Sequence, residues 1–418
     1  MRYGIVAIGS RGDVQPFVAL ALGLKNRDHE ATLMAHENFK EFVEGFGISF
    51  VPIRGDVEEM LQSDEGMQVL KKGDLLSFSK YLKKMTKNTA GTILDDILEA
   101  CEKADVLVAS LLALPWVDSV AEKLGKRWAI IQLSLPTVPT KVFPMAAMAI
   151  FNFPAFNLFT YRFYEFAYHL SGKKIVNKFR ESLGLSKLKV PLLKQIDLEK
   201  IPNLHCISPS LLARPDDWAA NNDITGFLFL PETVQKNIPD HLIQWLAEGD
   251  KPIYIGFGSI PVPDTNLLKA LIRHLLDTTS HRIIFCFGWS PKISLPENPR
   301  LFTVDTVSHQ WLLPQCKSAV IHGGVGTTAA VLKAGIPVVI ASIIADQPWL
   351  GKLIEQKKLG VHIPFRKLNP QKFAAAVERT QNATIVNNAQ VIGRQVSRED
   401  GVSRTLDILE KYFTPVYP

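Results

Sequence analysis

The chain has 418 residues, of which 47% are hydrophobic and 21% charged, and its formal net charge at pH 7 is +6. This composition is typical of a soluble globular enzyme, and the length allows two or three domains, each with a full core. The mild charge argues against nucleic-acid binding but leaves room for attraction to anionic substrates or to a membrane surface.

The four cysteines lie far apart and lack the spacing of metal ligands: Cys101, Cys206, Cys286 and Cys316. We therefore expect buried, reduced thiols. A strand pattern starts at Tyr3 without a preceding basic and apolar leader, so we expect a cytoplasmic protein.

The first half of the chain predicts a parallel sheet with helices on both faces, because short apolar runs alternate with amphipathic stretches. The runs predicted as strands are 3–8, 31–35, 106–110, 128–133 and 204–207. The stretches predicted as helices are 15–26, 40–46 and 89–103. This alternation is typical of a doubly wound α/β domain.

The turn after the first strand reads Gly-Ser-Arg-Gly-Asp-Val-Gln-Pro, from Gly9 to Pro16. It lacks the Gly-x-Gly-x-x-Gly spacing of dinucleotide-binding turns, which argues against a nicotinamide cofactor. Asp13 has two compatible interpretations: it caps the first helix, or it acts as a general base at the tip of the strand. Ser10 is a candidate for orienting an acceptor or contacting a donor.

Residues 142–161 contain no charged side chain, and this uncharged stretch is as long as a membrane span. Pro144 and Pro154 interrupt them, which favours a lipophilic pocket wall or an interfacial lip over a transmembrane helix. Aromatic and methionine side chains suit a flat lipophilic molecule, although the core of two helices explains about half of them. The candidate acceptor contacts are Phe143, Met145, Met148 and Phe151.

A stretch rich in Pro, Asn and Asp, 214–240, predicts a linker, after which the α/β pattern starts again. The second half predicts a helix at 267–277 and strands at 253–257, 282–287, 301–304, 318–321 and 338–341. The stretch 400–413 is an amphipathic helix with Val402, Leu406, Leu409 and Phe413 on one face.

The turn after strand 318–321 is the most informative part of the sequence. Gly323, Gly324 and Gly326 lead into a helix predicted over 327–334. The first amides of a helix lack partners within it and the helix dipole is positive there, so such a turn binds phosphate or diphosphate. Close packing of a strand against a helix is the structural alternative for these glycines.

Polar side chains surround this turn. His322 offers a polar or cationic donor at the strand end, and Thr327 and Thr328 offer hydroxyls. Asp346 and Gln347 follow the next strand and suit sugar hydroxyls, because a carboxylate beside a diphosphate would be repelled.

The sequence resembles the family 1 glycosyltransferases in two motifs. One is His-Gly-Gly-x-Gly-Thr-Thr followed by Asp-Gln, and the other is Ser-Arg-Gly-Asp at 10–13. The branch of sterol glucosyltransferases and bacterial antibiotic-modifying enzymes is the most similar. This resemblance implies the GT-B fold, α/β with two doubly wound, Rossmann-like domains facing across a cleft. It implies an acceptor-binding domain at 1–213, a linker at 214–240, a donor-binding domain at 241–399 and a C-terminal helix at 400–418 that packs back on the first domain.

The resemblance also suggests further donor contacts. Ser259 and Trp289 follow strands of the second half, although structural roles explain both nearly as well. Val304 stands where plant enzymes of the family carry a tryptophan that stacks on uracil. The resemblance therefore implies that backbone groups near Val307 contact the base instead, and the choice between UDP and TDP as the nucleotide stays open. No Asp-x-Asp occurs, and a metal that holds a nucleotide needs such paired carboxylates, so we expect no metal or cofactor.

The leading interpretation is an inverting glycosyltransferase with Asp13 as base, which moves a hexose from UDP-glucose to a sterol, terpenoid or polyphenol hydroxyl. The expected partners are therefore a nucleotide sugar and a lipophilic small molecule. Two alternatives on the same fold are a nucleotide-sugar epimerase and a non-catalytic nucleotide-sugar binder.

Overall fold

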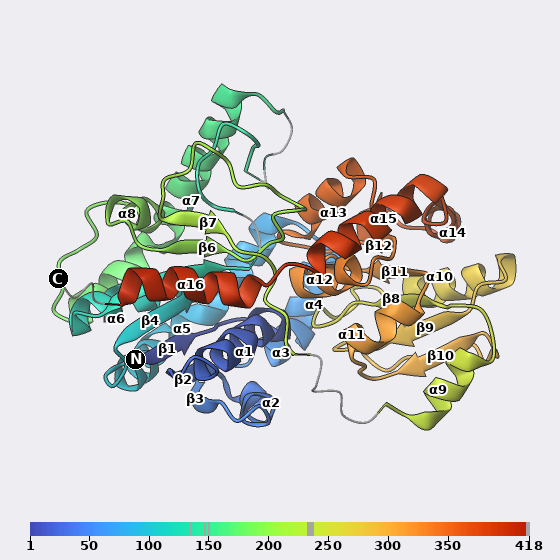
Figure 1. The fold of residues 1–418 in the computed structure, drawn as a ribbon, viewed down its shortest axis with the longest axis horizontal. Coiled ribbons are helices and arrows are strands. Elements are labelled where there is room, and N and C mark those ends of the chain that lie inside the picture. The colour runs from blue at the N-terminus through green and yellow to red at the C-terminus, as the bar shows by residue number, and fades with distance from the viewer. Residues whose placement is uncertain (134–135, 146–147, 149–150, 232–237, 415–418) are drawn as a thin grey trace. The chain divides into compact units, whose positions relative to one another are not determined.

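The computed structural model describes residues 1–133, 136–145, 148, 151–231 and 238–414 (Figure 1). The chain divides into two compact units. Unit 1 comprises residues 1–57, 83–230 and 399–418, and unit 2 comprises residues 58–82 and 231–398.

Unit 1 is built on a seven-stranded parallel sheet of order β3-β2-β1-β4-β5-β6-β7. The strands are β1 (Arg2–Val6), β2 (Glu30–His36), β3 (Ser49–Ile53), β4 (Val106–Ser110), β5 (Arg127–Gln132), β6 (Asn203–His205) and β7 (Asn222–Ile224). All five residues of β4 are buried, because helices cover both faces of a doubly wound sheet. The five strands predicted in this half are confirmed. The linker predicted at 214–240 contains β7, which pairs with β6.

The helices of unit 1 include α1 (Arg11–Lys25), α2 (Lys40–Glu44), α6 (Leu114–Leu124), α7 (Pro154–Ser182), α8 (Leu192–Leu198) and α16 (Gly401–Phe413). The last of these packs against the first. A Cβ on Gly23 of α1 would lie 2.6 Å from Cγ1 of Val402, so the two helices approach closely at this glycine. Arg27 forms ion pairs with Asp407 and Glu410 at 2.7 and 2.8 Å.

Unit 2 is built on a six-stranded parallel sheet of order β10-β9-β8-β11-β12-β13. The strands are β8 (Ile253–Gly256), β9 (Ile283–Cys286), β10 (Leu301–Val304), β11 (Ser318–Ile321), β12 (Val338–Ile340) and β13 (Gly360–His362). The helices include α9 (Asp240–Ala247), α10 (Thr265–Thr278), α11 (His309–Leu312), α12 (Val325–Lys333), α13 (Gln347–Gln356), α14 (Pro370–Arg379) and α15 (Ala383–Val396). The predicted α/β class with two doubly wound sheets is confirmed.

A segment of the first half belongs to unit 2. It contains α3 (Val57–Gln62), α4 (Asp64–Lys72) and the start of α5 (Leu75–Cys101). The side-chain amide of Gln62 donates to the carbonyl oxygen of Trp289 at 3.3 Å. The first predicted domain, 1–213, is therefore not one continuous block, because the polar helices at 58–82 pack with unit 2.

The apolar stretch 142–161 is not one helix, because α7 begins only at Pro154, where proline fits the first turn. Residues 146, 147, 149 and 150 of this stretch lie outside the described residues. In the described part of the chain, no helix combines the length and the apolar character that crossing a bilayer requires.

Candidate donor and base sites

The candidate donor residues of unit 2 follow the carboxyl ends of five neighbouring strands. In the order of the sheet, Val307 follows β10, Trp289 follows β9, Ser259 follows β8, His322 follows β11 and Asp346 follows β12. Ligands of doubly wound sheets bind outside this edge. The topology therefore brings together residues that are up to 87 positions apart (346 minus 259).

The glycine-rich turn adopts the geometry expected of an anion site. The first backbone hydrogen bond of α12 runs from the Thr328 amide to the Gly324 carbonyl at 2.9 Å. The amides of Val325, Gly326 and Thr327 therefore lack acceptors within the helix and lie at its positive end. Gly326 is exposed, and a Cβ there would meet no atom within 4 Å, so the space beside Gly326 is open.

His322 lies at the bottom of this turn. Burial lowers the pKa of His322 to about 4, so the imidazole is neutral at pH 7, which favours the polar over the cationic interpretation. Its Nδ1 is buried and has no hydrogen-bond partner among the described residues. A Cβ on Gly258 would lie 3.3 Å from the His322 ring and 3.7 Å from Oγ1 of Thr327, so these three residues converge.

Two of the predicted donor contacts are engaged elsewhere. The Thr328 hydroxyl donates to the Gly324 carbonyl at 2.9 Å, so its proton is not available to an anion. The Gln347 side-chain oxygen accepts from the amides of Ile343 and Ile344 at 2.8 and 3.0 Å. Only the side-chain amide nitrogen of Gln347 is left for a sugar hydroxyl. Of the two threonines, Thr327 is the better candidate for contacting an anion.

The turns that follow β8 and β9 contact each other. The Trp289 amide donates to the Gly258 carbonyl at 3.0 Å. Each turn contains a glycine with positive φ, +58° at Gly258 and +55° at Gly288. A Cβ on Gly288 would lie 2.3 Å from the Gly258 carbonyl oxygen, so no larger residue fits there. Sequence reasoning missed Gly258, although its place directly before Ser259 was visible.

Asp13 lies in the first turn of α1, after the central strand β1 of unit 1. Its Oδ2 accepts from the Ser10 amide at 2.7 Å and from the Ser10 hydroxyl at 3.0 Å. Gly9 has φ +139°, and a Cβ there would lie 2.3 Å from Oδ2, so only glycine leaves room for the carboxylate. Asp13 thus caps the helix, as one of the two interpretations requires.

Burial raises the pKa of the Asp13 carboxyl, and the two hydrogen bonds from Ser10 oppose that shift in part. Oδ1 has no hydrogen bond to any described residue. Arg11 of the same turn points elsewhere, because its guanidinium lies 4.0 Å from the ring centre of Phe42. Oδ1 is therefore the Asp13 oxygen left to bind a ligand, and it belongs to a carboxyl whose pKa is raised.

The four candidate acceptor residues do not share one environment. Met145 is buried, with 3% of its surface exposed, and its amide donates to the Thr160 hydroxyl at 2.8 Å. Phe143 and Met148 are half-buried, whereas Phe151 is 60% exposed. The four residues therefore differ in exposure, and their role in acceptor binding stays a prediction.

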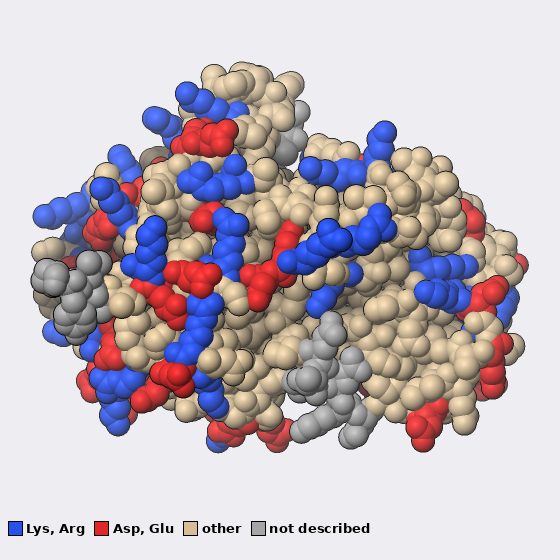
Figure 2. All heavy atoms as spheres, in the orientation of Figure 1, with Lys and Arg blue, Asp and Glu red and all other residues tan. Residues whose placement is uncertain are grey.

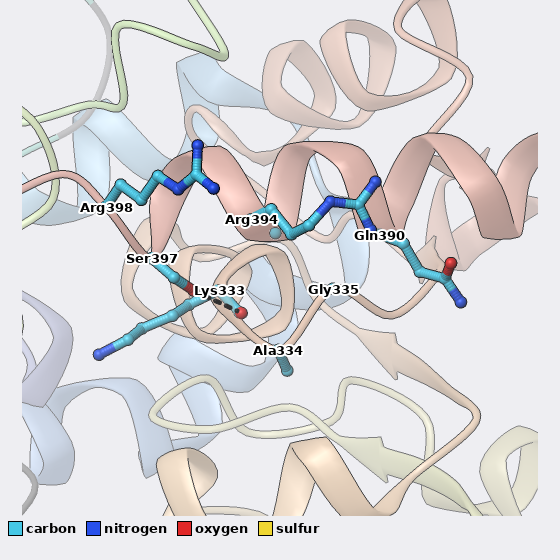
Figure 3. A pocket seen from close by; sticks show the side chains of 8 residues that line it. Lys333, Ala334, Gly335, Gln390, Arg394, Ser397 and Arg398 are labelled. Atoms are coloured by element: carbon cyan, nitrogen blue, oxygen red, sulfur yellow. Dashed lines mark hydrogen bonds between the residues drawn. The ribbon is translucent and has the colours of Figure 1, made fainter.

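Two hollows lie away from these groups. One, of about 430 Å³, is lined by Lys333, Arg394 and Arg398, at the end of α12 opposite the glycine-rich turn (Figure 3). A Cβ on Gly393 would lie 2.5 Å from Cα of Gly335, so this hollow borders a close helix contact. The other, of about 270 Å³ in unit 1, is lined by residues of α7 and α8, among them Arg162, Glu165, Lys194 and Asp197.

The comparison with known proteins covers nearly the whole chain. Residues 3–144 match the glycosyltransferase family 28 N-terminal domain, and residues 283–400 match the erythromycin biosynthesis protein CIII-like C-terminal domain. The chain is 33% identical to the sterol 3-beta-glucosyltransferase UGT80A2 of Arabidopsis thaliana, over 99% of this chain and 66% of that protein. The chain belongs to the GT-B glycosyltransferases.

Other glycosyltransferases of this fold are similar over shorter shares of their own length or at lower identity. A sterol 3-beta-glucosyltransferase of Komagataella phaffii is 32% identical over 98% of this chain, which spans 34% of that protein. The chain thus spans between about a third and two thirds of these two relatives. The glycosyltransferase of kitacinnamycin has a TM-score of 0.71 at 17% identity, covering 99% of both chains. CalG4, the calicheamicin glycosyltransferase, has a TM-score of 0.70 at 15% identity, covering 100% of this chain and 99% of CalG4.

Proposed function

We propose that this glycosyltransferase moves glucose from UDP-glucose to the hydroxyl of a sterol or a similarly flat lipophilic alcohol, with inversion at the anomeric carbon. The observation that carries the proposal is the set of donor residues following five neighbouring strands, in a chain whose relatives are sterol glucosyltransferases. Terpenoid and polyphenol alcohols are acceptors of the same chemical class.

In the proposed reaction, the acceptor oxygen forms a bond to the anomeric carbon while the bond from that carbon to the diphosphate breaks. The acceptor proton passes to Asp13, and UDP leaves with the bonding electron pair. A carboxyl whose pKa is raised by burial is a better proton acceptor than a free aspartate, provided that it stays ionised at the working pH.

The proposed donor site needs no metal. The departing diphosphate would be stabilised by the open amides of Val325, Gly326 and Thr327 and by an N–H of His322. Oriented amides of this kind stabilise developing negative charge without rearranging during the reaction. Asp346 and the Gln347 amide nitrogen would bind the sugar hydroxyls.

The test is an assay of the purified protein with UDP-glucose and TDP-glucose against sterols, other lipophilic alcohols and no acceptor. We expect a glucoside with inverted configuration from UDP-glucose and sterol, and unchanged rates in excess chelator. We expect Asp13→Asn to fold normally, to bind UDP and to lose about 100-fold or more in turnover.

Three outcomes would contradict the proposal. Conversion of the nucleotide sugar without acceptor would indicate an epimerase. UDP binding without turnover on any acceptor would indicate a binder. Loss of activity in chelator that Mg²⁺ restores would overturn the metal-free donor site.

A further inference from the structure

The helix α7 exposes a row of large apolar side chains. Phe159, Phe163, Phe166 and Leu170 are between 51% and 59% exposed. They are spaced by four, three and four residues, so they lie on one face of the helix over about three turns. We name these four residues the aromatic face of α7.

Ring contacts extend the aromatic face toward the start of the helix. The ring centres of Phe159 and Phe163 lie 6.2 Å apart, and those of Phe156 and Phe159 lie 6.4 Å apart. Phe156 in turn contacts Phe151 at 5.5 Å and Phe153 at 5.6 Å, both of which are more than half exposed. The exposed apolar surface is therefore contiguous, and soluble proteins keep such surfaces small unless something binds them.

The opposite side of α7 is already packed. Asn157, Thr160 and Tyr161 are buried near its start, and Val176 and Phe179 are buried near its end. The buried residues therefore fix the helix to unit 1, and the aromatic face is the outer side. In Figure 1 the start of α7 extends away from strands β6 and β7 of the same unit.

Positive charge borders the aromatic face. Arg162 is exposed beside it, and Lys173 and Lys174 are exposed one turn beyond Leu170. Glu165 and Arg162 both line the hollow shared with α8, but Glu165 is half-buried there, whereas Arg162 is exposed. Figure 2 shows uncharged surface over the upper end of α7, with Lys and Arg side chains at its edge and Asp or Glu side chains between them.

We propose that the aromatic face of α7 docks on a lipid bilayer that contains anionic lipid. A helix with aromatic residues on one face and Lys or Arg at its border lies in the plane of the membrane interface. The rings would enter the boundary between headgroups and acyl chains, while the long cationic side chains would reach anionic headgroups. A surface position of this kind requires no membrane-spanning helix.

A bilayer fits this face better than a second copy of the chain. Two copies paired through this face would bring the cationic side chains that border it in both copies, Arg162, Lys173 and Lys174, into one contact region, and like charges repel there. A small ligand fits less well because the side chains project from a convex helix, whereas small molecules bind in concave sites.

The experiment is co-sedimentation of the full chain with vesicles of phosphatidylcholine alone and of phosphatidylcholine mixed with phosphatidylserine. We expect binding to the mixed vesicles that Phe159→Ser, Phe163→Ser and Phe166→Ser together weaken by about tenfold or more. A matched control, Leu198→Ser, Ile243→Ser and Val391→Ser, replaces exposed apolar residues elsewhere and should bind like the parent protein.

A second pair of variants tests the charge. Arg162→Glu, Lys173→Glu and Lys174→Glu should remove the preference for phosphatidylserine, whereas Lys103→Glu, Lys123→Glu and Lys357→Glu, with the same charge change, should reduce it much less. Circular dichroism and thermal unfolding establish that each variant is folded. The assay contains no nucleotide or acceptor, so its result is independent of the proposed function.

Equal binding of the parent protein and the α7 serine variant would overturn the proposal. So would the absence of vesicle binding by the parent protein. Concentration-dependent dimerisation that the α7 serine variant abolishes, without vesicle binding, would assign the face to a second copy instead.

Discussion

At the scale of single residues, Ser10 sets the proton affinity of Asp13. Both of its hydrogen bonds to Oδ2 favour the ionised carboxylate, in opposition to burial. Removing the hydroxyl leaves only the backbone donor, so the pKa of Asp13 should rise further above its ordinary value.

We therefore predict that Ser10→Ala moves the acid limb of the pH profile of kcat/KM upward by up to about one pH unit. The sign follows because the base must be ionised to act, and a higher pKa keeps it protonated to a higher pH. Ser10→Thr retains a hydroxyl and should keep the parent profile. An acid limb that Ser10→Ala leaves in place would show that a group other than Asp13 is titrating.

Residue roles were the part of the site that the sequence predicted least well. The motif identified His322 and Thr328 as polar residues near a turn, but a motif does not show where a hydroxyl proton points. Thr328 donates to Gly324 within its own helix, and Gln347 accepts from two amides of its own turn. Such local bonds compete with ligand binding, and only the folded backbone decides between them.

At the scale of elements, two glycines of the turn before α12 have different roles, one in stability and one in binding. Gly323 has φ +91°, and a Cβ there would lie 2.7 Å from Cγ2 of Ile340. Gly326 is already helical, exposed and free of close neighbours. Two glycines of one motif are therefore required for different reasons.

We predict that Gly323→Ala lowers the free energy of unfolding by about 2 kcal/mol or more, because it combines an unfavourable φ with a clash. Gly326→Ala should leave stability equal or raise it by up to about 1 kcal/mol, because alanine favours the helix. The same Gly326→Ala change should weaken UDP binding by roughly tenfold, because the methyl group obstructs a phosphate at the open amides.

Chemical denaturation and calorimetric titration with UDP measure the two effects. Gly172→Ala is a suitable control, since Gly172 lies within α7 and a Cβ there would meet no atom within 4 Å. Unchanged UDP affinity in Gly326→Ala would exclude these amides from the nucleotide site.

The elements that the sequence predicted share one property, a run of buried apolar residues such as Ser318–Ile321 in β11. The short strands β7 (Asn-Asp-Ile) and β13 (Gly-Val-His) lack such runs, since each contains only one large apolar residue, and each pairs with a neighbouring strand that provides hydrogen bonds. Helices α3 and α4 could not be assigned to unit 2 from local patterns, because that assignment depends on contacts with residues more than 200 positions later.

At the scale of the whole molecule, His205 makes stability depend on pH. It is fully buried at the end of β6, its ring centre lies 4.9 Å from that of Trp218, and burial lowers its pKa to about 3. Neither ring nitrogen has a hydrogen-bond partner among the described residues. In an unfolded chain its pKa is about 6.5.

Between these pKa values the unfolded chain binds more protons than the folded one, so acidification from about pH 6.5 toward pH 3 destabilises the fold. We predict that His205→Leu removes this contribution. From pH 7 to pH 5 the variant should therefore lose about 2 kcal/mol less free energy of unfolding than the parent protein. Urea unfolding of both proteins at each pH measures the difference, in which groups common to both cancel. A parallel pH dependence in the two proteins would contradict the assignment.

The division of the chain has a consequence for biosynthesis. Unit 2 contains no residue beyond 398, whereas unit 1 needs α16, which packs on α1 and is translated after every residue of unit 2. The ribosome therefore synthesises every residue of unit 2 before unit 1 receives α16. Until then the side of α1 that carries Gly23 lacks the helix that covers it in the folded protein, and we expect chaperones to bind there.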